Sequence, residues 1–339
     1  MTVLSFLNPR HGLVQLLTAF AILSTPGLAL AQILFSCSAT MTPMMFGNVD
    51  LANGVGLTSS ASLTYQCTNT GISLPRHARI CFGIGDGTQG AGNFNPRVMK
   101  DGTGNELKFQ LFHPDGSTIW GTQGGAQLPE PVEIVLQNVP ARVTRTGTIS
   151  MQGRIISGQA PVAPGNFLND FSGPHTKISV KVSTLSLPAS CGTDNDGNFP
   201  FQVTATIDKS CNVDATDMNF GSVLQPVLAT NIDAQSNINV NCTLSTPYTI
   251  ALIPSNNSST GAGQMSPSGG LPGNTDKVPY QLYRDVVSTG QQWGSQIGVN
   301  TMAGTGTGLN QSYRVYGRVP FANFAADTYK DVVTVRVDY

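Results

Sequence analysis

The residues of this 339-residue chain with the clearest capacity for chemistry are six cysteines, at Cys37, Cys67, Cys81, Cys191, Cys211 and Cys242. Cysteines in this number bind metals, act as nucleophiles or form disulfides. No Cys-x-x-Cys pair occurs, and the three histidines beyond residue 31 lie in unrelated contexts. The sequence therefore predicts no zinc or other metal site.

The N-terminal segment favours disulfides. Residues 1–31 contain Arg10, an apolar run from Leu13 to Leu23 and the small-residue end Ala29-Leu30-Ala31. This is the order of a secretory signal peptide, here predicted to be cleaved before Gln32. A membrane anchor is the alternative, but the apolar run is shorter than the roughly 20 residues of a spanning helix. Secretion brings the cysteines into an oxidising compartment, where an even number predicts disulfides.

Two other stretches resemble sites of chemistry without meeting their requirements. Gly83-Ile84-Gly85-Asp86-Gly87 is rich in glycine, but no helical pattern follows that would hold a phosphate. The acidic stretch Asp194–Asn198 lacks the spacing of an EF-hand loop and is interpreted as a flexible interdomain linker. No Gly-x-Ser-x-Gly nucleophile motif is present. We therefore expect a protein that is not an enzyme and uses no cofactor.

The composition narrows the class of protein. Only 11% of the residues are charged and the formal net charge is −1, so a nucleic-acid binder with a domain-wide basic field is disfavoured. A hydrophobic fraction of 40% disfavours disorder. Abundant glycine, serine, threonine and asparagine between short apolar runs is typical of an extracellular β-protein.

The chain repeats itself once. Cys37 is followed by Phe46-Gly47 and Cys67, and the same order recurs as Cys211, Phe220-Gly221 and Cys242. Later landmarks recur in the same order as well: Phe109–Phe112 with Trp120 matches Tyr280–Tyr283 with Trp293, and Gly153-Arg154 matches Gly317-Arg318. The duplication predicts the disulfides Cys37–Cys67 and Cys211–Cys242, and it leaves Cys81 to pair with Cys191.

Local patterns predict strands throughout. Ten stretches alternate apolar and polar residues with period two: Leu63–Cys67, Leu107–Phe112, Val132–Leu136, Thr148–Gln152, Ile178–Val182, Phe201–Ile207, Ile238–Cys242, Tyr248–Ile253, Arg314–Val319 and Val332–Tyr339. About seven short strands and one disulfide per repeat predict an all-β fold of two tandem immunoglobulin-like sandwiches. We predict a signal peptide over 1–31, a first domain over 32–192 and a second over 193–339.

The second half carries a specific pattern: Cys211, Phe220-Gly221, Tyr280-Gln281-Leu282-Tyr283, Trp293-Gly294, and the ending Tyr329 to Tyr339 with alternating valines. In this it resembles the spore-coat-U-like domain, which forms subunits of archaic chaperone–usher pili in Gram-negative bacteria. The first half carries a degraded version of the pattern. Two such domains in one chain resemble the tip adhesins of Csu-type pili.

The resemblance implies a mode of assembly. Such pilins lack one strand, which the N-terminal extension of the adjacent pilus subunit donates, and a periplasmic pilus chaperone covers the groove before the outer-membrane usher assembles the fibre. Only Gln32–Ser36 precede Cys37, too short to donate a strand, so a distal position is expected. Phe199–Ile207 matches a donor strand and either completes the first domain in cis or begins the second. The resemblance implies that the chaperone grips the last strand through Val333, Val335, Val337 and Tyr339.

Three apolar loops of the first domain, at Thr42–Leu57, His113–Pro131 and Gln159–Phe171, are the expected contacts with an abiotic or host surface, in the way that the family's tip adhesins use apolar loops. The predicted surface-binding residues are Met44, Met45, Leu51, Val55, Leu57, Ile119, Pro161, Val162, Pro164, Phe167 and Leu168. Phe46 and Trp120 are predicted to be core, since Phe220 and Trp293 match them.

The function predicted is a tip adhesin that promotes biofilm. Two alternatives stay open. One is a structural spore-coat or extracellular matrix protein. The other is a sugar-binding minor pilus subunit, with a cleft formed by Asp115, Trp120 and Glu130.

Overall fold

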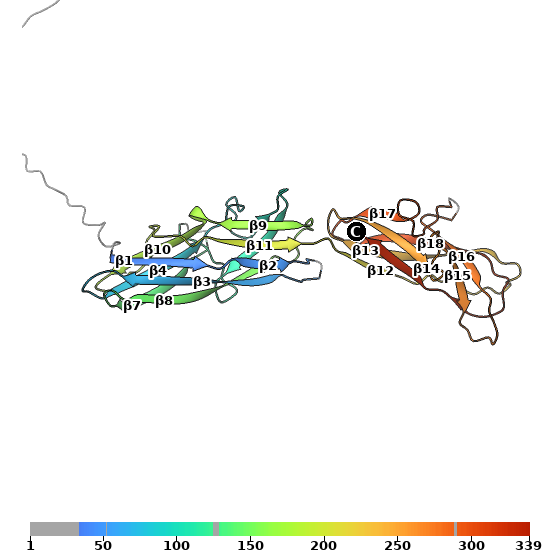
Figure 1. The fold of residues 1–339 in the computed structure, drawn as a ribbon, viewed down its shortest axis with the longest axis horizontal. Coiled ribbons are helices and arrows are strands. Elements are labelled where there is room, and N and C mark those ends of the chain that lie inside the picture. Colours follow the sequence, from blue (N-terminus) through green and yellow to red (C-terminus); the bar gives the residue numbers. More distant parts are fainter. Residues whose placement is uncertain (1–33, 52, 125–128, 288–289) are drawn as a thin grey trace, which may run out of the picture.

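Two β-sandwiches lie end to end in the computed structural model, which describes residues 34–51, 53–124, 129–287 and 290–339 (Figure 1). The predicted signal peptide lies outside these residues. Within the described residues no helix has both the length and the apolar character needed to cross a membrane. One short 3-10 turn, η2 (Gly173–His175), interrupts the strands.

The first sandwich contains eleven strands: β1 (Phe35–Met41), β2 (Met44–Asn48), β3 (Thr58–Asn69), β4 (Arg76–Ile84), β5 (Arg97–Lys100), β6 (Glu106–Phe112), β7 (Val132–Val139), β8 (Thr144–Ile155), β9 (Gly165–Phe171), β10 (Thr176–Ser183) and β11 (Phe201–Ile207). One sheet has the order β1-β3-β8-β6-β5-β9-β11-β2, and the other has the order β10-β4-β7. Their inward side chains form one core.

The second sandwich contains nine strands: β12 (Cys211–Ala215), β13 (Thr230–Cys242), β14 (Pro247–Pro254), β15 (Ala262–Pro267), β16 (Val278–Tyr283), β17 (Met302–Thr305), β18 (Gln311–Phe321), β19 (Tyr329–Lys330) and β20 (Val333–Asp338). Its sheets have the orders β12-β13-β18-β16-β15-β19 and β17-β14-β20. The order β12-β13-β18-β16-β15 repeats β1-β3-β8-β6-β5, so the duplication seen in the sequence is a duplication of topology.

The predicted all-β class is confirmed, and every stretch predicted to be a strand overlaps one. The reason is that period-two alternation suits a strand with one face in a core. The sequence analysis treated Met44–Asn48 and Gly165–Phe171 as parts of loops, whereas they are β2 and β9. Both strands pair with β11, which is remote in sequence from β2, and β9 also pairs with β5 at Leu168.

All three predicted disulfides are present: Cys37–Cys67, Cys211–Cys242 and Cys81–Cys191. The first two join residues that lie directly opposite each other in the antiparallel pairs β1–β3 and β12–β13. The third joins β4 to the segment after β10. A closed loop of about 100 residues contributes roughly 4–5 kcal/mol in the loop-entropy model, so this bridge is the strongest covalent restraint on the first sandwich.

The segment Asp194–Asn198 is not the flexible linker expected from its sequence. The backbone N–H of Ile178 donates to the carbonyl of Gly197 at 2.7 Å, and the N–H of Asp196 donates to the carbonyl of Ile178 at 2.8 Å. The segment thus runs along β10, and the chain then enters the large sheet as β11. The change from one sandwich to the other falls after Ile207, later than the boundary predicted at residue 193.

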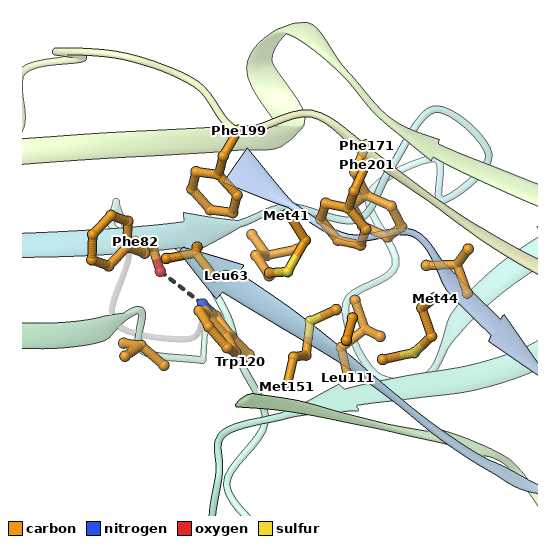
Figure 2. Close-up of a cluster of buried hydrophobic side chains, with 14 of the residues drawn as sticks. Met41, Met44, Leu63, Phe82, Leu111, Trp120, Met151, Phe171, Phe199 and Phe201 are labelled. Atoms are coloured by element: carbon orange, nitrogen blue, oxygen red, sulfur yellow. Dashed lines mark hydrogen bonds between the residues drawn. The ribbon is translucent and has the colours of Figure 1, made fainter. Parts of the chain in front are cut away.

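Figure 2 shows the core of the first sandwich, where Trp120 lies among Leu63, Phe82 and Met151. Trp120 is fully buried, and its indole N–H donates to the carbonyl of Phe82 at 2.7 Å. Phe46 is also buried, so the prediction that these two aromatic residues are core is confirmed.

Candidate functional site

The strand β11 fills a slot in the first sandwich between β9 and β2. It is antiparallel to β9, with Phe201 opposite Phe171, and parallel to β2, with Val203 opposite Met44. Its inward side chains are all buried: Phe201, Val203, Ala205 and Ile207. The rings of Phe201 and Phe171 stack at a centroid distance of 4.7 Å (Figure 2). The first sandwich is therefore completed in cis, as one of the two hypotheses for this segment expected.

The same slot in the second sandwich holds no strand among the residues that the structure describes. Met44 and Phe46 pack over β8, and Met218 and Phe220 pack over β18 in the same way. In the first sandwich β11 pairs with the strand that carries Met44 and Phe46, and both side chains are buried. In the second sandwich both are only half-buried. The two pairs lie over equivalent glycines, Gly153 and Gly317, but Met44–Asn48 is a paired strand and residues 218–220 are irregular and less buried, so the two sandwiches differ at this strand position.

Apolar side chains line the chain around this open slot. The segment after Phe220 forms no strand up to Thr230, and it exposes four aliphatic side chains: Val223, Leu224, Val227 and Leu228. Leu224 is 94% exposed. Aliphatic residues gathered in this way indicate a contact surface, because single exposed apolar residues are normally scattered.

The strand β20 is an edge strand of the smaller sheet in the second sandwich. Its residues predicted to bind a chaperone are Val333, Val335, Val337 and Tyr339, of which the three valines are half-buried and Tyr339 is exposed. At the corresponding place in the first sandwich, Ile178 and Val180 of β10 are buried, because residues 194–197 cover that strand. In the described part of the second sandwich, only β14 pairs with β20.

The end of the first sandwich farthest from the second carries three loops, 70–75, 140–143 and 184–190, which we call the distal end (Figure 1). Three aliphatic side chains of these loops face solvent: Ile72 is 80%, Leu74 56% and Leu185 91% exposed. These three residues are not among those that the sequence predicts to contact a surface. Runs such as Gly71-Ile72-Ser73-Leu74 lack a distinctive pattern, and only the topology brings them to the same end.

Asn69, the last residue of β3, holds two of these loops. It is fully buried, and its side-chain amide donates to the carbonyls of Leu74 and Val139, both at 2.9 Å. Its Oδ1 accepts the N–H of Gly71 at 3.0 Å. The third loop is anchored by Arg79, whose Nε donates to the carbonyl of Pro188 at 2.7 Å.

We expect Asn69→Ala to loosen the distal end without unfolding the chain. Three backbone groups would lose their partners, at about 1–3 kcal/mol for each group that stays buried and unsatisfied. Amide hydrogen exchange should rise in residues 70–75 and 140–143 and stay unchanged in the second sandwich. Thr68→Ala is the matched control, since that half-buried side chain forms its hydrogen bond with the Thr144 hydroxyl and none with a loop backbone group. Equal exchange in both variants would contradict the assigned role.

The prediction of exposed loop residues is wrong for Met44, Val162 and Phe167. All three side chains are buried. Figure 2 places Met44 in the core near Leu111 and Met151. Met44 and Phe167 lie on strands that flank β11, and alternation along these strands turns them inward.

Three other predicted surface residues border the second sandwich: Leu51, Val55 and Pro161 line a cleft together with the buried Val162 and with Asn241, Thr243 and Gly308. The loops that carry them are at the junction end of the first sandwich. They therefore do not form the free end that a surface contact requires.

The remaining predicted residues are dispersed. Leu57, Ile119 and Pro164 are half-buried. Met45 and Leu168 are exposed, and each lies opposite Thr204 of β11, on the outer face of the sheet. They form a single short row and no loop tip.

The sugar-binding cleft predicted from Asp115, Trp120 and Glu130 does not form around Trp120, because the indole is fully buried and cannot stack on a ligand. Asp115 belongs to a turn. Hydrogen bonds from the Thr118 hydroxyl and from the N–H groups of Ser117 and Thr118 hold the pKa of the Asp115 carboxyl below its usual range.

Arg97, another residue that the sequence analysis missed, is fully buried and structural. Its guanidinium donates to the carbonyls of Ile84, Gly85 and Trp120 and to the side chain of Gln110. Burial lowers the pKa of Arg97 to about 9. The group ties β5 to the opposite sheet.

Comparison with known proteins gives the family. A model of the Spore Coat Protein U domain matches the sequence twice, over residues 23–170 and 197–336. A search of the curated proteins finds no matching sequence. One similar solved structure is a chaperone–tip adhesion subunit pre-assembly complex from archaic chaperone–usher Csu pili of Acinetobacter baumannii. It is 15% identical, the match covers 90% of this chain and 100% of that chain, and the TM-score is 0.47. Another is the CupB6 tip adhesin from Pseudomonas aeruginosa, with 12% identity, coverage of 89% and 94%, and a TM-score of 0.32.

Proposed function

Because the chain belongs to the Spore Coat Protein U domain family, we propose that it is the tip adhesin of an archaic chaperone–usher pilus. It reaches the cell surface through the periplasm, attaches bacteria to abiotic or host surfaces and promotes biofilm. One observation carries this proposal: the two copies of the domain differ at one strand position. The first copy holds β11 of its own chain there, and the described part of the second copy holds none. A subunit with a closed outer domain and an open inner domain ends a fibre.

The unoccupied strand position beside residues 218–220 determines which proteins the chain binds during assembly. An adjacent pilus subunit adds a strand there by main-chain hydrogen bonding, with alternate side chains entering the core. Before that step a periplasmic chaperone covers the exposed aliphatic side chains and β20, because an open sheet edge with apolar side chains promotes aggregation. The outer-membrane usher then exchanges the chaperone for the donor strand.

In this proposal the distal end is the part of the chain that contacts the surface. Ile72, Leu74 and Leu185 are exposed on loops at the end farthest from the second sandwich, whereas Val55 and Pro161 line the cleft at the junction with it. When these aliphatic loops contact an apolar surface, their burial contributes a favourable free energy of about 25 cal/mol per Å² of apolar area removed from water.

The test is periplasmic production of Gln32–Tyr339 with and without an archaic-pilus chaperone. We expect soluble protein only with the chaperone, in a 1:1 complex. The matched variant Leu228→Asp, in the exposed segment beside the slot, should weaken the complex, whereas Leu185→Asp at the distal end should not. A stable monomer that forms without chaperone would reject the pilus assignment and favour the coat or matrix protein.

A further inference from the structure

The distal end and the ends of the strands that lead into it are rich in basic residues. The ranges 70–79, 139–145 and 181–190 contain no Asp or Glu, yet they hold five of the protein's 18 Lys and Arg residues: Arg76, Arg79, Arg142, Arg145 and Lys181. The whole chain has a formal net charge of −1, so this concentration is local. Arg79 pairs with Glu133.

Three of these arginines have no acidic partner. Within the described residues, Arg76, Arg142 and Arg145 form no ion pair, and the Nε of Arg76 is buried without a hydrogen-bond partner. The Arg76 guanidinium lies over Gly71, directly beside the loop that presents Ile72 and Leu74. Arg142 and Arg145 are exposed. Arg142 and Arg145 are therefore available to an anion outside the protein, and Arg76 is half-buried beside the loop.

Arg142 occupies a conformation that does not suit its side chain. Its φ is +64°, in the left-handed region that favours glycine. The backbone is held there by the Arg142 N–H, which donates to the carbonyl of Asn69 at 2.7 Å. A glycine would fit the turn better, so the arginine is not explained by the fold. Residues kept in strained conformations concentrate at functional sites.

From these observations we propose that the distal end binds an anionic phospholipid membrane. Ile72, Leu74 and Leu185 enter the boundary between headgroups and acyl chains, while Arg76, Arg142 and Arg145 hold the lipid phosphates. Aliphatic tips with a basic rim are the combination that interfacial membrane binding requires. The inference rests on the proposed function, because it specifies the surface that the tip contacts.

The types of side chain in these three ranges favour an anionic lipid surface over a nucleic acid or another extended polyanion. The same three ranges contain no Phe, Tyr or Trp. Single-stranded nucleic acid is bound with stacking aromatic rings, and an extended polyanion gains nothing from exposed aliphatic tips. Only a surface that is both anionic and apolar satisfies the arginines and the aliphatic side chains together.

The experiment measures co-sedimentation of the full mature chain, in its chaperone complex, with vesicles. One set contains phosphatidylcholine alone, and the other an equal mixture with phosphatidylglycerol. We expect binding to the mixed vesicles that weakens with salt. Arg142→Gly and Arg145→Gln should each weaken it about fivefold, since each basic residue near an anionic surface contributes about 1 kcal/mol. Ile72→Ser should weaken it roughly tenfold.

Two controls distinguish a loss of binding caused by the missing charge from one caused by unfolding. Arg142→Gly relieves the backbone, so its thermal stability should equal or exceed that of the parent while its binding falls. Arg314→Gln removes an exposed arginine of β18 in the second sandwich and should leave binding unchanged. Equal binding to both vesicle types, or equal loss with Arg314→Gln, would overturn the proposal. Competition by a soluble anionic polysaccharide as effective as that by phosphatidylglycerol vesicles would also overturn it.

Adhesion of the same samples to polystyrene distinguishes failure of the lipid proposal from failure of the proposed adhesin function. Adhesion to polystyrene without binding to anionic vesicles would overturn the lipid proposal and leave the tip adhesin intact. Absence of both would contradict the proposed function as well.

Discussion

Replacing Val203 with aspartate is expected to unfold the first sandwich and leave the second one folded. Val203 is fully buried in β11, opposite Asn169 of β9 and Met44 of β2. The substitution removes a buried apolar side chain worth about 2 kcal/mol and leaves a carboxylate without a partner, at a cost of several kcal/mol more. The sum is comparable to the whole stability of a typical domain, about 5–15 kcal/mol.

Tryptophan fluorescence measures this outcome, because each sandwich holds one of the protein's two tryptophans, Trp120 and Trp293, both fully buried. The Trp120 emission should shift to longer wavelength and the Trp293 emission should not. Gln202→Asp is the matched control: it places the same charge one residue away on β11, where the side chain is exposed. If the two variants were equally stable, β11 would not be part of the first core.

Giving the second sandwich a strand of its own should stabilise it strongly. The addition is a flexible linker as long as segment 184–198, placed after Tyr339 and followed by a copy of Phe199–Ile207. This reproduces the connection that leads from β10 to β11. A strand of micromolar affinity at a millimolar effective concentration contributes about 4 kcal/mol. We expect the unfolding temperature of the second sandwich to rise by roughly 10 °C or more.

The matched control carries the same extension with aspartates in place of the copied Val203 and Ala205. Calorimetry should show the rise only with the apolar strand, and the chaperone should no longer copurify with that version. An equal rise with both extensions would mean that no apolar slot is open beside Met218 and Phe220. No rise with either would mean that the second sandwich needs no further strand.

The amino-acid sequence alone determined the strands with regular alternation and the covalent framework. Alternating side chains such as those of Phe201–Ile207 specify a strand locally, because only a pleated segment puts every second side chain on one face. The duplication specified the disulfides, because Cys37–Cys67 and Cys211–Cys242 join the same two strands in each copy.

Only the tertiary structure decided what those elements contact. Met44–Asn48 becomes a strand because β11 supplies its hydrogen bonds, and Met218–Phe220 with similar residues stays irregular because no strand among the described residues pairs with it. The burial of Met44 and Phe167 depends on that same pairing. The positions of Val162 and Val55 depend on which end of the first sandwich leads into the second sandwich. The distal end arises likewise, since Ile72, Arg142 and Leu185 lie on three separate loops. A local pattern specifies the backbone of a segment, whereas exposure is a property of the neighbours that long-range pairing brings to it.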